Sequence, residues 1–283
     1  MFNLETKLAN LKLKNPVVLS SGTFDHTITK HIDVGKLGAI TTKTITLKPR
    51  EGNPLPHIIR TKFGFLNSVG LKNPGINKYL AEELPFWQKQ NAEVICSIGG
   101  ESISEYIKLA KILNNVNLNA IEVNISCPNV KGGLTFSENI GKLKELTLKI
   151  RKAFNGTLIV KLSSNTTDIK LSASAALTGG ADILTLVNTF FGLAIHPVTG
   201  KFYFTRKIGG YSGPAIKPMA LRAVFEVYNQ FKCPIIGGGG IVSIHDAIDF
   251  LRMGAKAVFI GSANYLDPQI SIKILNGLKR VSI

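Results

Sequence analysis

Short apolar runs recur along the chain, and most of them lack the polar alternation of a strand with one face in water. Continuous apolar runs of four to eight residues are typical of parallel strands buried on both faces. The pattern predicts eight strands, at Val17–Ser20, Ala39–Thr42, Val94–Ser97, Ala120–Asn124, Leu158–Leu162, Ile183–Val187, Pro234–Gly237 and Ala257–Ile260.

Amphipathic stretches with helical spacing lie between several of these runs. We predict helices at Ile103–Leu113, Ile140–Ala153, Lys170–Leu177, Pro218–Tyr228 and Ile244–Leu251. Strands that alternate with helices indicate an α/β fold with a parallel sheet, and eight such strands favour a closed (β/α)8 TIM barrel over an open, doubly wound sheet. No linker-like break divides the chain, so residues 1–283 form one predicted domain.

Three segments fall outside this repeat. Phe2–Lys14 alternates and contains Ala9-Asn10, which predicts a hairpin that plugs the N-terminal end of the barrel. Thr44–Gly75 and Asn188–Lys217 are too long for ordinary βα loops, which take about 2–6 residues. Both follow strand C-termini, where barrel enzymes build their active sites, so they are expected to form substrate walls and lids.

Composition and charge narrow the class of protein. A hydrophobic content of 45% is typical of a globular chain, and no apolar run approaches the roughly 20 residues of a membrane span. Residues Met1–Glu5 show no basic region followed by an apolar stretch, so a secretory signal is not expected. The three cysteines are widely spaced and odd in number, so no disulfide framework or zinc site is expected, and this favours a cytoplasmic protein. The net charge of +16 suits anionic ligands, but the lysines are scattered, which favours a solvated surface over a nucleic-acid footprint.

Glycines end the seventh and eighth predicted strands, in Gly237-Gly238-Gly239-Gly240 and in Gly261-Ser262. Glycine lets main-chain N–H groups approach a phosphate closely, and the loops after strands seven and eight form the recurring phosphate site of this barrel. Tight turns alone are the alternative. The occurrence of both glycine groups at these two strands favours phosphate binding.

Lysines and amides occupy other strand ends. Lys43 follows the second strand and Lys161 lies near the end of the fifth, where burial requires an anion or a strong acceptor. An interior salt bridge explains one such lysine, whereas two favour an electron-rich ligand such as a flavin ring edge. Asn67, Asn124, Asn129 and Asn188 suit a flat heterocycle with alternating C=O and N–H groups, although each one alone is typical of a turn or cap.

Cys127 follows the fourth strand inside Asn124-Ile125-Ser126-Cys127-Pro128-Asn129. None of the five histidines shares a motif with it, so a general base is favoured over a nucleophile, and an unreactive packing thiol remains the alternative. Cys96 and Cys233 are expected to be buried packing residues.

These segments resemble the class 1 dihydroorotate dehydrogenases over nearly the whole chain, and most closely the type B catalytic subunit. The matching segments include Thr42-Lys43-Thr44, Asn67–Gly75, Val123–Gly133 (VNISCPNVKGG), Val160-Lys161-Leu162, Asn188-Thr189 and Gly209–Pro218 (GGYSGPAIKP). The resemblance implies oxidation of dihydroorotate to orotate in pyrimidine biosynthesis, with FMN as cofactor and Cys127 as general base. Class 2 enzymes have serine at the base position and a membrane-associating N-terminal extension, and neither is expected here.

The resemblance also implies roles for individual residues. FMN would be held by Ser21, Lys43, Thr44, Asn124, Lys161, Val187, Gly213, Gly239, Gly240, Gly261 and Ser262. Dihydroorotate would be held by Lys43, Asn67, Ser68, Val69, Gly70, Leu71, Asn124, Asn129, Asn188 and Thr189. The sequence departs from the family pattern at Ser164, where proline is expected, and at Gly238, which replaces a larger residue.

The electron acceptor follows from the type B resemblance. A type B subunit passes electrons to NAD through a partner subunit that carries FAD and a 2Fe–2S cluster, in a homodimer or a dimer of heterodimers. A fumarate-linked type A enzyme, a dihydropyrimidine reductase and a tRNA dihydrouridine synthase are the alternatives. The last lacks support here, because no basic RNA-binding domain follows residue 270.

Overall fold

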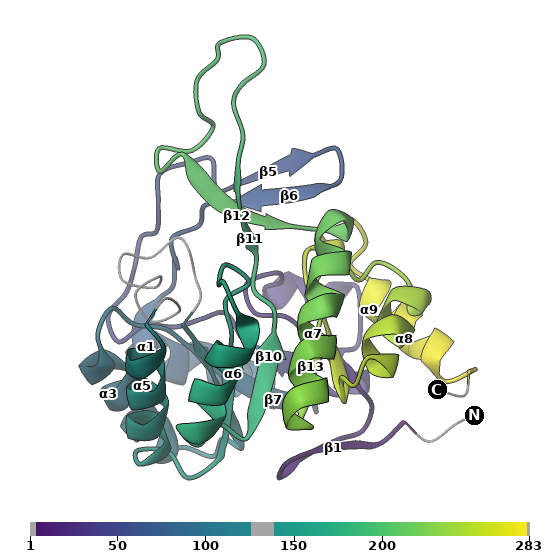
Figure 1. Cartoon of the computed structure of the whole chain (residues 1–283). Coiled ribbons are helices and arrows are strands. Elements are labelled where there is room, and N and C mark those ends of the chain that lie inside the picture. The colour runs from purple at the N-terminus through teal and green to yellow at the C-terminus, as the bar shows by residue number, and fades with distance from the viewer. Residues whose placement is uncertain (1–3, 126–138, 282–283) are drawn as a thin grey trace.

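The computed structural model describes residues 4–125 and 139–281 of the chain, and its centre is a closed barrel of eight parallel strands (Figure 1). Val258 of the last strand pairs with Val17 of the first, so the sheet closes on itself and the open, doubly wound alternative is excluded. Each strand lies within one residue of its predicted bounds. The barrel strands are β3 (Val17–Leu19), β4 (Ala39–Thr41), β7 (Glu93–Ile98), β8 (Ala120–Asn124), β9 (Thr157–Lys161), β10 (Ile183–Leu186), β13 (Ile235–Gly237) and β14 (Ala257–Ile260).

Helices surround the barrel and bury their apolar faces against it (Figure 1). The α-helices are α1 (Gly75–Lys78), α2 (Leu84–Gln88), α3 (Ile103–Asn114), α5 (Ile140–Arg151), α6 (Ile169–Thr178), α7 (Lys217–Phe231), α8 (Ile244–Arg252) and α9 (Ile270–Leu278). Short 3₁₀ helices cover His26–Lys30, Val34–Lys36, Pro214–Ile216 and Ser262–Tyr265, and a π-helical turn covers Tyr79–Glu83. No helix in the described ranges is long and apolar enough to cross a membrane.

Five helices, α3 and α5 to α8, confirm the predicted set, whereas α1, α2 and α9 were not expected from the sequence. Pro85 is the second residue of α2, and proline weakens the helical pattern there because it offers no N–H for the ladder. In α9, Gly277 lowers the helix propensity, but a Cβ there would meet Ile244 Cδ1 at 2.5 Å. Close packing against α8 therefore overrides the weak local signal.

An antiparallel hairpin closes the N-terminal end of the barrel, as predicted (Figure 1). It consists of β1 (Thr6–Leu8) and β2 (Leu11–Leu13), and its turn places Ala9 in the left-handed region at a φ of 51°. Leu8, Leu11 and Leu13 are buried in one apolar cluster with residues of the barrel strands, among them Val18 and Ile95. The lower end of the barrel is therefore an apolar plug, and the opposite end is left for ligands.

The two long segments after β4 and β10 were expected to be loops, but each of them also contains two strands. They contain β5 (Ile58–Thr61), β6 (Gly64–Asn67), β11 (Phe190–Leu193) and β12 (Ile208–Ser212). These strands form one antiparallel sheet in the order β11-β12-β6-β5, which lies above the C-terminal ends of the barrel strands (Figure 1). Gly210 pairs with Asn67 across more than a hundred residues of chain, a long-range pairing that no local pattern reveals.

Candidate active site

A cavity of about 300 Å³ lies at the C-terminal ends of the barrel strands, partly under the β5–β6 and β11–β12 strands. All of the predicted cofactor-binding residues line it: Ser21, Lys43, Thr44, Asn124, Lys161, Val187, Gly213, Gly239, Gly240, Gly261 and Ser262. So do most of the predicted substrate-binding residues: Lys43, Asn67, Val69, Gly70, Leu71, Asn124, Asn188 and Thr189. The two predicted groups therefore share one space.

Three predicted residues stand apart from this set. The Ser68 side chain is buried outside the cavity, because its hydroxyl accepts a hydrogen bond from Asn53 Nδ2 at 3.0 Å. Cys127 and Asn129 lie outside the described residues.

The described wall of the cavity carries cations and no acids. Lys43 and Lys161 line it, and Arg60 and Lys62 of the β5–β6 hairpin add two more cations. Lys43, Arg60 and Lys62 are exposed, so the burial expected of Lys43 is not found. Lys161 is only 5% exposed, and its ammonium lies 5.3 Å from the centroid of the Phe259 ring. A low-dielectric cavity lined by one sign of charge concentrates ligands of the opposite sign, so this wall suits an anionic ligand.

A chain of hydrogen bonds joins two amides at the cavity. Asn124 Nδ2 donates to Thr44 Oγ1 at 3.1 Å, and Asn188 Nδ2 donates to Asn124 Oδ1 at 3.3 Å. The Tyr106 hydroxyl of α3 donates to the main-chain carbonyl of Asn124 at 2.9 Å and holds the end of β8 in place. The amides that the sequence placed at separate strand ends are therefore oriented by each other.

Ser164 and Asn165 anchor the strand end that carries Asn188. Ser164 Oγ donates to the carbonyl of Thr189 at 2.7 Å, and Asn165 Nδ2 donates to the same oxygen at 3.0 Å. A proline at position 164 would remove the first of these bonds. Ser164, which departs from the family pattern, thus helps to hold the cavity wall in place through this hydrogen bond.

The glycines after β13 and β14 form one corner of the cavity. Gly240 has a φ of 81°, and a Cβ there would lie 2.8 Å from the Gly213 carbonyl oxygen, so only glycine fits without strain. At Gly261 a Cβ would meet no atom closer than Thr23 Cγ2 at 3.8 Å, so the space in front of it is open. This corner presents main chain to a ligand, as a phosphate site requires.

Position 238 is a glycine for a different reason: a Cβ there would meet the Phe259 ring at 2.8 Å. Phe259, on the neighbouring strand β14, therefore occupies the space that the expected larger side chain at position 238 would fill. The same ring also faces the Lys161 ammonium.

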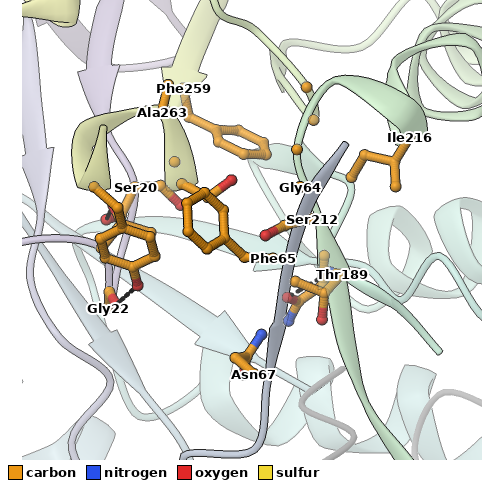
Figure 2. A pocket seen from close by; sticks show the side chains of 18 of the residues that line it. Ser20, Gly22, Gly64, Phe65, Asn67, Thr189, Ser212, Ile216, Phe259 and Ala263 are labelled. Atoms are coloured by element: carbon orange, nitrogen blue, oxygen red, sulfur yellow. Dashed lines mark hydrogen bonds between the residues drawn. The ribbon is translucent and has the colours of Figure 1, made fainter. Parts of the chain in front are cut away.

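An aromatic pair connects the upper sheet to the barrel (Figure 2). The Phe65 ring of β6 packs edge-on against Tyr265, with centroids 5.4 Å apart, and the Tyr265 hydroxyl donates to the carbonyl of Gly22 at 3.1 Å. Burial raises the pKa of Tyr265 to about 12, so its hydroxyl stays a neutral donor. The pair forms an uncharged part of the cavity wall.

The two described cysteines are packing residues, as predicted. Cys96 is fully buried and Cys233 nearly so, and neither lines the cavity. Burial raises the pKa of the Cys96 thiol to about 12 and that of Cys233 to about 11, which keeps both thiols protonated.

Sequence reasoning missed several residues at the site. Arg60, Lys62, Phe65 and Tyr265 gave no signal, because their approach to the cavity depends on the upper sheet and on η5 (Ser262–Tyr265). Glu122 did carry a signal: it is a carboxylate inside the apolar run Ala120–Asn124, and the argument applied to Lys161 applies to it as well.

Comparisons with known proteins agree with this geometry. A family model described as dihydroorotate dehydrogenase matches residues 3–281. The chain is 45% identical over 284 residues to a Thermoanaerobacter pseudethanolicus protein, a match that covers 99% of this chain and 94% of the relative. A Caldicellulosiruptor saccharolyticus protein is 44% identical over 280 residues, which are 98% of this chain and 93% of the relative. An Alkaliphilus metalliredigens protein is 41% identical, with the same shares.

All three relatives are named dihydroorotate dehydrogenase B (NAD(+)), catalytic subunit. The identities far exceed what a shared barrel alone requires, and the matches run through the strand ends that form the cavity. The chain belongs to the dihydroorotate dehydrogenase family.

Proposed function

We propose that this chain oxidises dihydroorotate to orotate, with FMN in the cavity and Cys127 as general base. The observation that carries the proposal is the convergence of predicted flavin and pyrimidine residues on one cationic cavity, in a chain of the dihydroorotate dehydrogenase family. Dihydroorotate and FMN are both anions, which suits a wall whose described charges are all positive.

The residues of the cavity fit FMN. The glycine corner leaves open space in front of Gly261, and main chain that carries no side chain suits a phosphate there. Gly239, Gly240, Gly261 and Ser262 would hold this phosphate. Lys43, Thr44, Asn124 and Lys161 would hold the ring, because ammonium and amide donors suit the carbonyl edge of a flavin.

The reaction removes two hydrogens from neighbouring carbons. Cys127 Sγ, as thiolate, takes the proton from C5 of dihydroorotate, and the electrons of that C–H bond form the C5=C6 double bond. FMN held in the cavity would supply the acceptor for the hydride that leaves C6. Asn67, Asn124 and Asn188 orient the pyrimidine ring, and Lys43 offsets its negative charge.

Electrons then leave to a partner subunit. The relatives are named catalytic subunits, which implies a second subunit in those enzymes. For this chain we propose a partner with FAD and a 2Fe–2S cluster that passes electrons to NAD, in a dimer of heterodimers. A cytoplasmic location stays a prediction.

Replacement of Cys127 by Ala tests the base. Because general-base catalysis contributes about 10²–10⁴-fold, Cys127→Ala should slow flavin bleaching by dihydroorotate at pH 7 by at least about a hundredfold. FMN should remain bound at the wild-type ratio, as measured from the absorbance spectrum. A variant that bleaches at the wild-type rate removes Cys127 from the mechanism.

The acceptor is tested with fumarate and NAD. The chain alone should reduce neither at a useful rate, and it should reduce NAD once the iron–sulfur partner has been added. Turnover with fumarate by the chain alone would assign it to the fumarate-linked alternative.

A further inference from the structure

Glu122 is a buried carboxylate below the cavity that the mechanism above does not use. It lies two residues before Asn124 on β8, and side chains two apart on a strand share a face. It is 3% exposed. Thr185 Oγ1 donates to its Oε2 at 3.0 Å, and Thr185 is on β10, two strands away, so this bond crosses the barrel interior.

The second oxygen of Glu122 starts a path to the cavity. Ser97 Oγ donates to Glu122 Oε1 at 3.4 Å, and the same hydroxyl lies 2.9 Å from Thr44 Oγ1. Thr44 in turn accepts from Asn124, which accepts from Asn188. Four hydrogen bonds therefore connect the buried carboxylate to two amides at the cavity wall.

The groups at the two ends of this path determine its direction: Ser97 donates to the Glu122 carboxylate, and the Thr189 main-chain N–H donates to Asn188 Oδ1. A hydroxyl has one proton to donate. Because Ser97 gives its proton to Glu122, it must accept from Thr44, and Thr44 must then accept from the Asn124 amide nitrogen. This leaves Asn124 Oδ1 to accept from Asn188 Nδ2, and Asn188 Oδ1 to accept from the Thr189 main-chain N–H at 2.8 Å.

We propose that Glu122 is a positioning residue that keeps the Ser97 and Thr44 hydroxyls matched to the cavity amides. As an acceptor at one end of the path, it orients these hydroxyls so that Thr44 accepts from Asn124, and this holds Asn124 and Asn188 in place for the pyrimidine ring. This inference rests on the proposed function. A carboxamide at position 122 could donate to Ser97 and turn both hydroxyls toward Asn124, which would set two donors against each other at the contact between Thr44 Oγ1 and Asn124 Nδ2.

Two variants test the path with orotate as the probe. Glu122→Gln allows the Ser97 and Thr44 hydroxyls to turn, and Ser97→Ala interrupts the path while Glu122 stays in place. Each should raise the orotate dissociation constant of the FMN-loaded protein by about tenfold, because hydrogen bonds aligned by a charged group are the strong ones. The titration follows the perturbation of the flavin spectrum at equilibrium, and bound FMN and Tm are measured alongside.

Coupling distinguishes a path from independent effects. The double variant should bind orotate no more weakly than either single variant, because both interrupt the same path. The control is Thr147→Val on α5, which removes a buried hydroxyl bonded to the Leu143 carbonyl and should lower Tm without changing orotate affinity.

The outcomes separate the two proposals. Wild-type affinity for orotate in both Glu122→Gln and Ser97→Ala overturns the inference alone, and so do additive losses in the double variant. If Glu122→Gln does not fold, Ser97→Ala with the Thr147→Val control decides. A wild-type protein that binds FMN but not orotate overturns the proposed function, and this inference with it.

Discussion

Gly240 and Gly261 lie at the same corner of the cavity but are glycines for different reasons. At Gly240 the backbone is left-handed and a Cβ would collide with protein atoms, among them Lys217 N at 3.0 Å. At Gly261 the protein leaves room for a Cβ. The first residue is thus required by the fold, and the second by whatever occupies the space in front of it.

Gly261→Ala should therefore weaken FMN binding without weakening the fold. We expect the Tm of the flavin-free protein to stay unchanged, and the FMN dissociation constant to rise about tenfold, since an extra methyl in a filled site is costly. Fluorescence titration with FMN and thermal unfolding measure the two quantities.

Gly240→Ala is the contrasting variant and should lower Tm even without flavin, because its φ is unfavourable for alanine. Full FMN affinity in Gly261→Ala would show that the phosphate lies elsewhere.

At the scale of elements, the start of α8 connects the glycine corner to α7. Ser243 Oγ caps α8 by accepting from the Asp246 N–H, and Asp246 accepts from the Val242 N–H in return. Lys217, the first residue of α7, forms ion pairs with Asp246 and with Asp249. These contacts hold the turn that contains Gly239 and Gly240 between two helices.

Asp246→Asn tests this connection through pH. Burial acts to raise the pKa of Asp246, but hydrogen bonds from Lys217, Ser243 and Val242 outweigh it and hold the pKa below its ordinary value. A lowered pKa means that the stabilisation is present above the unfolded-state value and is lost as pH falls through the folded-state value.

We therefore expect Asp246→Asn to lose about 1 kcal/mol of unfolding free energy at pH 7, and to approach wild type below about pH 4. Urea unfolding at several pH values measures this. A loss that is equal at pH 3 and pH 7 would contradict the role of the charge.

Elements also show how far the sequence predicts this protein. All eight barrel strands follow from buried apolar runs, because parallel strands need no partner-specific signal. The upper sheet does not, since strands such as β6 and β12 are short, contain glycine and pair across long stretches of chain. The residues that reach the cavity through that sheet, Phe65 and Arg60, were missed for the same reason.

The site divides in the same way. Strand-end residues such as Lys43 and Asn188 were predictable, because a barrel brings all strand ends to one face. The hydrogen-bond order among Thr44, Asn124 and Asn188 was not, since it depends on side-chain directions across several strands. The hydrogen bond from Asn53 to the buried Ser68 hydroxyl could not be predicted from the sequence for the same reason.

At the scale of the molecule, a net charge of +16 surrounds a cavity whose described charges are positive. Anions are attracted by such a field, and salt screens it with a Debye length of about 10 Å at 0.1 M. Lys43, Arg60 and Lys62 are exposed cations of the cavity wall, and Arg60 and Lys62 belong to no predicted binding set, so their contribution should be a field effect that depends on salt.

The double variant Arg60→Gln with Lys62→Gln should lower kcat/KM for dihydroorotate about threefold at low ionic strength, and the difference should vanish near 0.5 M salt. Steady-state rates over a salt series provide the measurement. Lys149→Gln on α5 is the matched control, because it removes a cation outside the cavity and should change nothing. A threefold loss that persists at high salt would indicate a direct contact instead of a field effect.

The central claim, that this chain carries FMN and oxidises dihydroorotate, is tested most directly by an anaerobic titration of the purified protein. The account predicts one FMN per chain, complete loss of the oxidised flavin absorbance on addition of one equivalent of dihydroorotate, and one equivalent of orotate formed. A protein that binds FMN but keeps its oxidised spectrum with excess dihydroorotate would contradict it.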